Sequence, residues 1–284
     1  MSRSIAGLSA LAPAYDGFIV DLWGVVHDGI DPYPGAVECL HTLRDAGKRV
    51  VLLSNAPRRL EPVRETLRRI GVPDACYDGL LTSGEATRMA LLDPPDDWFR
   101  ALGRRCWHLG PAKDANLFDN LALERTDGPD GADFVLNTGP DDTLGESDPA
   151  PYLPDLRRCK ALSLPMLCAN PDLEVVRAGK RIICAGWLAR LYAEMGGVVR
   201  QIGKPDPAIY QPVLAMLGTE RARTLAIGDS LATDIAGAKA AGIDSLWVLG
   251  GIHGAALDAD SGLMERELLR LALSPVAAIA RLAW

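Results

Sequence analysis

Short apolar runs that end abruptly in polar residues recur along the chain. The runs and the polar residues that follow them are 18–20 with Asp21, 49–53 with Ser54-Asn55, and 224–227 with Gly228-Asp229-Ser230. Continuous apolar runs of this length are typical of parallel strands that are buried on both faces. Because open α/β sheets bind ligands at the carboxyl ends of their strands, these runs predict strands that deliver polar groups to one common edge.

Amphipathic segments separate these runs. Val37, Leu40 and Leu43 recur at helical spacing before Gly47, which predicts a helix over 36–47 with a glycine C-cap. Further helices are predicted over about 58–70, 187–195 and 231–241, and the tail, 264–283, is predicted to be helical with an interruption at Pro275. The alternation of strand and helix predicts an α/β fold, a doubly wound, Rossmann-like parallel sheet.

The middle of the chain differs in character from the two ends. It is rich in proline and glycine, with Pro94-Pro95 and a proline-rich stretch from 140 to 154. Its own strands are predicted at 106–109, 134–137 and 165–170. We therefore expect a core domain formed by residues 1–81 and 182–284, with an inserted α/β domain over 82–181.

Composition narrows the classes of function. The 284 residues carry a net charge of −7, which argues against a general nucleic-acid binder. No run of 18 apolar residues is present, so no membrane association is expected, and six scattered cysteines without zinc spacing are typical of a reducing compartment. No secretory signal is seen at the first residues, and a cytoplasmic location is expected. A homodimer is compatible with the sequence.

Other enzyme classes lack their signatures in this sequence. No Gly-x-Gly-x-x-Gly follows a predicted strand, which argues against a dinucleotide-dependent oxidoreductase. A Walker A sequence and a Gly-x-Ser-x-Gly sequence are also absent, which argues against a P-loop kinase and a serine-centred hydrolase.

Four polar segments, in order, resemble the four motifs of the haloacid dehalogenase superfamily. They are Asp21, Ser54-Asn55, the segment Gly203-Lys204-Pro205-Asp206-Pro207, and Gly228-Asp229-Ser230 with Asp234. The insertion between the second and third motifs is similar to class IIA, the NagD-like hydrolases, and Asn170-Pro171-Asp172 resembles the end of that type of cap. The resemblance covers nearly the whole chain and implies a C2-type cap on a Rossmann-like core.

The resemblance also implies roles for these residues. Asp21 would be the nucleophile that forms an aspartyl-phosphate, which divides a difficult hydrolysis into two steps. Ser54 and the Asn55 backbone would donate hydrogen bonds to the transferred phosphoryl group, and Lys204 would supply positive charge to it. The implied substrate is a small phosphorylated metabolite.

A Mg²⁺ ion is implied because the Asp21 carboxylate and a phosphate group repel each other. By resemblance its protein ligands are Asp21, the backbone carbonyl of Trp23, and Asp229, a set of hard oxygen atoms that suits this ion. Asp234 and Ser230 would lie behind the ligands and orient them.

Trp23 departs from the pattern of most phosphatases in the superfamily, which carry a second aspartate at this position. That aspartate protonates the leaving oxygen and then activates water, a contribution worth ~10²–10⁴-fold in rate. An indole cannot do this, although a backbone carbonyl ligand survives any change of side chain. The form Asp-x-Trp-Gly, with His-Asp-Gly after it, resembles a subgroup of the family.

Three interpretations follow from Trp23. The first is a Mg²⁺-dependent hydrolase that is slow or specialised, either for acyl or aryl phosphates or with His27 or Asp28 as the substitute acid. The second is a phospho-ligand binding or regulatory protein with a lapsed active site. The third is a different reaction on the same scaffold, such as phosphonate cleavage or phosphoryl transfer to another acceptor. The first is favoured because Asp21, Lys204 and Asp229 are all present.

Overall fold

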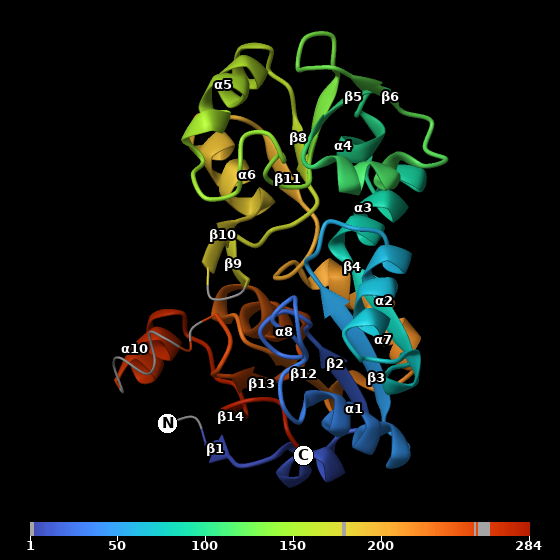
Figure 1. Cartoon of the computed structure of the whole chain (residues 1–284), viewed down its shortest axis with the longest axis vertical. Helices are drawn as coiled ribbons and strands as arrows, with labels where there is room; N and C mark the ends of the chain where they lie inside the picture. The colour runs from blue at the N-terminus through green and yellow to red at the C-terminus, as the bar shows by residue number, and fades with distance from the viewer. Residues whose placement is uncertain (1–2, 178–179, 253, 255–261) are drawn as a thin grey trace.

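A parallel sheet of seven strands forms the lower lobe of the computed structural model, which describes residues 3–177, 180–252, 254 and 262–284 (Figure 1). Every neighbouring pair in this sheet is parallel. In spatial order the strands are β1 (Ser4–Ile5), β14 (Ala277–Ile279), β13 (Asp244–Val248), β12 (Thr224–Gly228), β2 (Gly17–Val20), β3 (Arg49–Ser54) and β4 (Gly79–Thr82).

The order of the strands reverses between β2 and β12. The chain moves outward from β2 through β3 to β4, leaves the sheet, and returns at β12 on the other side of β2 before moving outward again. Such a reversal opens a crevice beyond the carboxyl ends of the two central strands, where doubly wound folds bind their ligands. Asp21 directly follows β2 and Asp229 directly follows β12, so both residues lie at this crevice.

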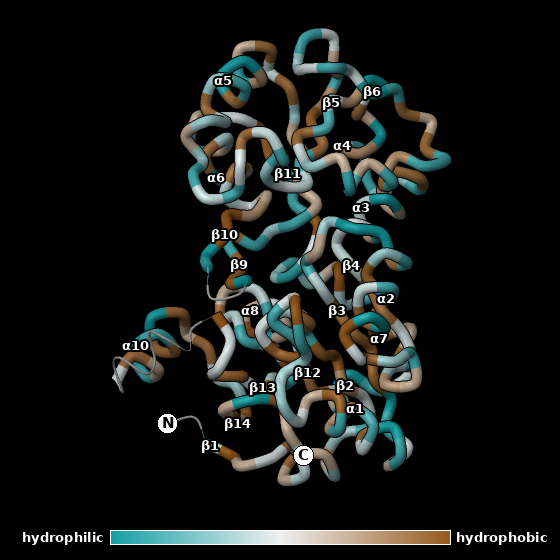
Figure 2. Tube along the Cα trace, in the orientation of Figure 1, coloured by the Kyte–Doolittle hydropathy of each residue, from teal (hydrophilic) through white to brown (hydrophobic). Residues whose placement is uncertain are grey.

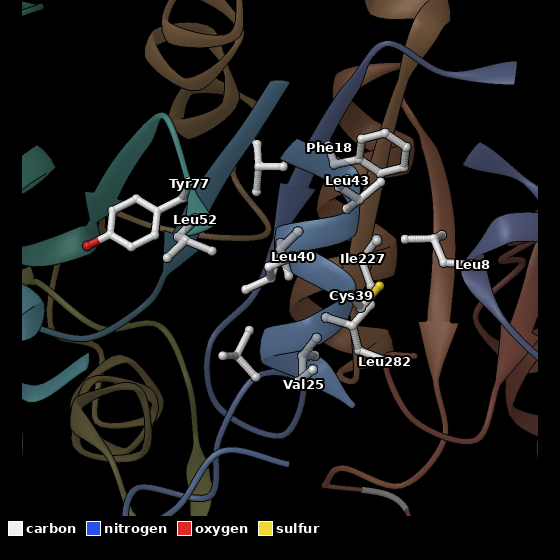
Figure 3. Close-up of a cluster of buried hydrophobic side chains, with 14 of the residues drawn as sticks. Leu8, Phe18, Val25, Cys39, Leu40, Leu43, Leu52, Tyr77, Ile227 and Leu282 are labelled. Carbon is white, nitrogen blue, oxygen red and sulfur yellow. The ribbon is translucent and has the colours of Figure 1, made fainter. Parts of the chain in front are cut away.

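Helices cover both faces of the core sheet because the buried strands are apolar on both sides. Phe18 and Val20 face one hydrophobic cluster and Ile19 faces the other, as the alternation along a strand requires. The first cluster includes α1 (Ala36–Asp45) and α2 (Leu60–Arg69), and the second includes α7 (Tyr210–Leu217) and α8 (Ala236–Ala241). Figure 3 shows Leu40 and Leu43 of α1 among side chains from the strands, and Figure 2 shows apolar residues concentrated along β2, β3 and β12.

A second parallel sheet, of five strands, forms the upper lobe in Figure 1. Its spatial order is β11 (Val199–Gln201), β8 (Met166–Cys168), β7 (Phe134–Asn137), β5 (Arg105–Leu109) and β6 (Glu124–Thr126). Its helices are α3 (Ser83–Leu92), α4 (Asp97–Arg100), α5 (Leu153–Ala161) and α6 (Ala185–Glu194). Together with the lower lobe this arrangement confirms the predicted α/β class, a Rossmann-like core with a capping unit.

An antiparallel hairpin lies between the two lobes (Figure 1). It consists of β9 (Glu174–Arg177) and β10 (Lys180–Ile183), and it follows directly on the chain segment that leaves β8. The hairpin therefore extends from the upper lobe and covers the carboxyl edge of the core sheet.

Several short 3₁₀ helices, one π-helix and one further α-helix complete the described structure. They are the 3₁₀ turns η1 (Leu8–Ala10), η2 (Ala12–Ala14), η3 (Asp74–Cys76), η4 (Ala112–Phe118), η5 (Ala150–Tyr152), η6 (Pro207–Ile209) and η7 (Arg221–Arg223), the π-helical turn η8 (Leu231–Ile235), and the α-helix α10 (Leu263–Arg270). None of the helices in the described part of the chain has both the length and the apolar character needed to cross a bilayer.

Two sequence-based expectations need correction. Residues from 182 onward were assigned to the core, yet α6 packs in the core of the upper lobe and β11 pairs with β8, so we propose that the cap extends to about residue 202. The sequence predicts a helical tail over 264–283 with an interruption at Pro275, yet residues 277–279 form β14 between β13 and β1. Both segments pair with strands that are distant in the sequence, and local sequence does not reveal these backbone hydrogen bonds.

Candidate active site

A cavity of about 390 Å³ opens between the carboxyl edge of the core sheet and the cap. The core contributes the residues that follow its central strands, and the cap contributes residues 171–176 of the hairpin segment. Residues of all four predicted motifs therefore line the same cavity. The lining includes Asp21, Trp23, Ser54, Asn55, Lys204, Asp229, Ser230 and Asp234.

Lys204 forms the electrostatic centre of this cavity. Its ammonium nitrogen donates hydrogen bonds to Asp21 Oδ1 at 2.6 Å, Asp234 Oδ1 at 2.7 Å and the Leu53 carbonyl at 3.1 Å. The three charged side chains are almost completely buried. Burial alone would lower the pKa of Lys204, but the Asp21 and Asp234 carboxylates outweigh it and raise that pKa well above its usual value. Lys204 is therefore a permanent cation at the site.

The Asp21 carboxyl titrates near neutral pH in this arrangement. Burial raises its pKa from 3.8 to about 7, and the charge of Asp234 acts in the same direction, while Lys204 opposes the shift. A further cation close to Asp21 would stabilise the ionised form that a nucleophile needs.

The Asp229 carboxylate packs closely against the backbone and lies near other negatively charged side chains. Its Oδ2 accepts a hydrogen bond from Ile252 N at 2.6 Å, and a Cβ atom on Gly24 or Gly251 would lie 2.0 Å from that same oxygen. Gly24 also has a φ of +79°, which L side chains rarely adopt. Burial raises the pKa of Asp229 well above its usual value, and the negative charges of Asp21 and Asp234 add to the effect.

The carboxylates fit a divalent cation. Asp21, Asp229 and Asp234 each place an oxygen within 4.8 Å of the others. Lys204 is the one cation that the described lining places among these three acids, so the cluster is short of positive charge. Asp234 is already engaged at both oxygens, by Lys204 and by the Ser230 N–H at 3.1 Å, which leaves Asp21 and Asp229 as ligands. Hard carboxylate oxygens of this kind suit Mg²⁺.

Asn55 joins the cap to the core. Its Oδ1 accepts from Lys204 N at 2.8 Å and from Ser83 Oγ at 3.1 Å, and its Nδ2 donates to the Lys204 carbonyl at 3.0 Å and to Asp172 Oδ1 at 2.8 Å. Ser83 and Lys204 stand on the two chain segments that connect the lobes. The preceding Ser54 is buried and its Oγ accepts from Ala56 N at 3.2 Å, which leaves its hydroxyl hydrogen available to a ligand.

Trp23 occupies the wall of the cavity with its indole. The ring packs edge to face against His27, with centroids 5.1 Å apart, and a Cβ on Gly29 would lie 2.3 Å from it. A second cavity, of about 150 Å³, lies on the other side of Trp23 between the core and the cap. The indole thus marks the place where two cavities meet.

The structure does not bring His27 or Asp28 into the cavity that holds Asp21. His27 is 3% exposed, its Nδ1 accepts from Gly29 N at 2.9 Å, and burial lowers its pKa to about 4, so it is neutral at pH 7. Asp28 accepts hydrogen bonds from the backbone N–H groups of Asp31 and Ile30, which lower its pKa and keep it ionised. The geometry therefore opposes a role as the substitute acid for either residue.

Asp172 is the site residue that reasoning from the sequence missed. It follows β8 and lines the cavity from the cap side, and burial raises its pKa from 3.8 to about 6 against the opposing effects of Lys204 and Asn55. The available signal was its position two residues after the predicted strand 165–170, close to the strand-end placement of Asp21 and Asp229.

Comparison with known proteins identifies the family. A family model described as haloacid dehalogenase-like hydrolase matches residues 18–124, and a second model for HAD-like hydrolases matches residues 201–266. The crystal structure of a haloacid dehalogenase-like hydrolase from Brucella suis 1330 is 33% identical, covers 98% of this chain and 99% of that one, and superposes with a TM-score of 0.84. The chain belongs to the haloacid dehalogenase-like family.

Two further relatives indicate the branch of the family. The ribonucleotide monophosphatase NagD of Escherichia coli K12 is 27% identical over 82% of this chain and 87% of its own length. A glycerol phosphate phosphatase from Mycobacterium tuberculosis, solved in complex with magnesium, is 27% identical with a TM-score of 0.65, over 85% of this chain and 69% of that one. The predicted membership of the NagD-like class IIA hydrolases is thereby confirmed.

Proposed function

We propose that this hydrolase is a Mg²⁺-dependent phosphatase that acts on a small phosphorylated metabolite through an aspartyl-phosphate on Asp21. The observation that carries the proposal is the buried Asp21 carboxylate, which Lys204 holds at 2.6 Å beside Asp229 at the reversal point of the sheet. The phosphatase names of the relatives support the reaction class, and the magnesium complex of one relative supports the ion.

The roles of the residues follow from their contacts. Lys204 engages Asp21 Oδ1, so the other carboxylate oxygen attacks phosphorus and the ester bond to the leaving group breaks. The Ser54 hydroxyl and the Asn55 N–H donate to the phosphoryl oxygens, and Lys204 offsets the charge that develops there.

The ion would be held by residues of two central strands. Asp21, Asp229 and the Trp23 carbonyl would hold Mg²⁺, which when bound would reduce the repulsion between the carboxylate and the phosphate. Among the described residues the Trp23 carbonyl accepts no hydrogen bond, so this oxygen is free to serve as a ligand.

Trp23 stands where most phosphatases of the superfamily carry an aspartate, so no carboxylate at this position can act as acid and base. Without another acid in the cavity, acyl and aryl phosphates, whose leaving groups need little protonation, would react at the first step more readily than alkyl phosphates. A phospho-ligand binding protein with a lapsed site, and an enzyme for phosphonate cleavage or phosphoryl transfer, are the competing functions. They predict, respectively, binding without turnover and no net hydrolysis of phosphate esters.

The test is release of inorganic phosphate from p-nitrophenyl phosphate, acetyl phosphate, sugar phosphates and nucleotides, with and without Mg²⁺. We expect metal-dependent turnover in the native chain and its loss in Asp21→Asn. Asp16→Asn is a matched control, since Asp16 is an exposed carboxylate paired with Arg223 and does not line the cavity. Turnover that persists in Asp21→Asn would refute the assignment of the nucleophile.

A further inference from the structure

The leaving group of a bound phosphate ester must lie on the cap side of the cavity. Displacement at phosphorus is roughly in line, so the leaving oxygen departs opposite to the attacking oxygen. Asp21 attacks from the carboxyl end of β2 in the core, and the hairpin segment 171–176 covers the opposite side. The core position from which most of the superfamily protonates the leaving oxygen holds the indole of Trp23 here, so an acid for that oxygen has to be sought on the cap.

Most ionisable groups that line the cavity are already engaged or stand on the core side. Lys204 directs its three donors to Asp21, Asp234 and the Leu53 carbonyl, and both oxygens of Asp234 accept hydrogen bonds. Tyr33 is on the core side, and burial raises the pKa of its phenol above the usual value, which makes it a weak acid. Two cap-side carboxylates remain among the described lining residues, Asp172 and Glu174.

The two cap-side carboxylates differ in their partners. Glu174 forms an ion pair with Arg181 across the hairpin, and its carboxylate accepts a hydrogen bond from that guanidinium. Asp172 has no ion pair among the described residues, and its Oδ1 accepts one hydrogen bond, from Asn55 Nδ2 at 2.8 Å. When Oδ1 accepts a bond, the proton of the neutral acid resides on Oδ2, which has no partner among the described residues and is free to donate.

The position of Asp172 relative to Trp23 supports the same role. Among the described residues, four line both the 390 Å³ cavity and the 150 Å³ cavity, namely Trp23, Ser54, Asp172 and Val175. Asp172 therefore faces the junction that Trp23 also faces, where the superfamily ordinarily has the carboxylate that Trp23 replaces. A leaving group that extends from phosphorus toward the second cavity passes this junction.

We propose that Asp172, supplied by the cap, acts as the acid and base that the residue at position 23 cannot be. The neutral carboxyl of Asp172 gives its Oδ2 proton to the bridging ester oxygen as the bond from that oxygen to phosphorus breaks and the bond from Asp21 to phosphorus forms. The resulting Asp172 carboxylate then takes a proton from a water molecule, whose oxygen attacks phosphorus as the Asp21–phosphorus bond breaks. This releases phosphate and restores both carboxyl groups.

Asp172 is suited to both steps because its environment makes both the neutral and the ionised form of its carboxyl accessible. Burial raises its pKa to about 6, Asp234 adds to that effect, and Lys204 with the Asn55 amide moderates it. On its own lobe, the thiols of Cys168 and Cys184 interact with Asp172, and burial raises their pKa values, so they stay neutral. A pKa close to the working pH is the condition for an efficient proton donor and acceptor.

This inference rests on the proposed phosphatase function, and Asp172→Asn tests it because asparagine keeps the shape and the acceptor for Asn55. Phosphate release from glycerol 3-phosphate, an alkyl ester, should fall by about 10²-fold or more. With p-nitrophenyl phosphate, whose leaving group needs no acid, the variant should release a burst of p-nitrophenolate equal to the enzyme concentration and then turn over slowly, because the base for the second step is missing. The phosphoenzyme should accumulate and be detectable by mass spectrometry.

Asp130→Asn is the matched control, since Asp130 is an exposed cap carboxylate paired with Arg158 that lines neither cavity. It should show neither the burst nor the loss of alkyl ester turnover. Adding Trp23→Asp to Asp172→Asn should restore the second step and abolish the burst. Failure of this double variant to regain activity with both substrates would argue against a shared role of the two positions.

The possible failures are distinguishable. If native protein shows no Asp21-dependent turnover, the proposed function fails and this inference fails with it. If native protein turns over both esters and Asp172→Asn lowers both equally without a burst, only the role of Asp172 is overturned. If Asp172→Asn does not fold, the turnover rates of the native protein decide. Rates for alkyl and aryl esters that lie within about tenfold of each other support an acid in the cavity, and a difference of about 10³-fold or more overturns the role of Asp172.

Discussion

Replacing Lys204 with methionine would remove the cation that the described residues place among Asp21, Asp229 and Asp234. The ammonium group is buried and makes two short contacts with carboxylates, at 2.6 and 2.7 Å. Methionine has a similar length and no charge, so the change isolates the electrostatic contribution. Without the ammonium group, three buried acids face one another with no compensating charge.

The magnitude follows from these contacts. Each charge-assisted hydrogen bond contributes about 1.5–3 kcal/mol, and removal of one partner from a buried ion pair costs about 3–5 kcal/mol. We therefore expect Lys204→Met to lower the free energy of unfolding by about 3–5 kcal/mol at pH 7 in the presence of a chelator. The loss should shrink at pH 5, because the folded-state pKa of Asp21 is already raised to about 7 and protonation removes the repulsion.

The sign of the pH dependence is specific. Carboxyls whose folded-state pKa lies above the unfolded value stabilise the fold at low pH, and that stability is lost as the pH rises through the folded value. The free energy of unfolding of Lys204→Met should therefore fall between pH 5 and pH 8 more steeply than that of native protein. Mg²⁺ should stabilise the variant more than native protein, because the ion no longer competes with an ammonium group.

Urea denaturation followed by circular dichroism, at pH 5, 7 and 8 with and without Mg²⁺, measures these quantities. Lys48→Met is the control, because Lys48 lies outside the cavity, 3.6 Å from the partly exposed Asp16 and hydrogen-bonded to the Tyr15 carbonyl at 2.6 Å, and its loss should cost about 2 kcal/mol or less. A loss below about 1 kcal/mol for Lys204→Met in chelator, or a pH dependence like that of native protein, would refute the charge balance deduced for the site.

Three further predictions concern the loop after β2. In the Asp172→Asn background, Trp23→Asp should raise turnover of alkyl phosphates by about 10²-fold, measured as phosphate release against p-nitrophenyl phosphate, whereas in native protein, where Asp172 already supplies the proton, it should change turnover little; no gain in the double variant would contradict the role assigned to the missing carboxylate. Gly24→Ala should abolish Mg²⁺-dependent stabilisation in thermal melts, because its Cβ would meet the Asp229 carboxylate, whereas Gly47→Ala, with open space around it, should retain it. Because the pKa of His27 is lowered from 6.5 to about 4, native protein should lose about 3 kcal/mol more than His27→Gln between pH 6.5 and 4; parallel curves would disprove this.

The residues that the sequence could place are those whose position depends on local pattern. Asp21 and Asp229 come directly after buried apolar runs, and parallel strands align their carboxyl ends, so proximity of the two residues followed without any coordinates. Lys204 could be placed through the resemblance of its Gly-Lys-Pro segment, but its contacts with Asp21 and Asp234 depend on the return of the chain from the cap.

His27 shows that a local pattern does not give the direction of a side chain. It lies in the same loop as Trp23, and proximity in sequence suggested that it could face Asp21. The turn closes with Gly29 N donating to His27 Nδ1, the ring packs against the indole, and His27 lines the second cavity and not the one that holds Asp21. The direction of a side chain in a loop depends on hydrogen bonds that composition does not encode.

By itself, the sequence determined the α/β core, the insertion and the strand-end acids, because apolar runs and helical spacing are local properties of the chain. Only the tertiary structure decided the partners: β11 joins the sheet of the cap, residues 277–279 form a strand between β13 and β1 despite their alanines, and Asp172 reaches the cavity of Asp21. The physical reason is that strand pairing and the closure of a cavity depend on backbone hydrogen bonds and contacts between residues far apart in the chain. Asp172 and Asn55, 117 positions apart, meet at 2.8 Å only in the folded protein.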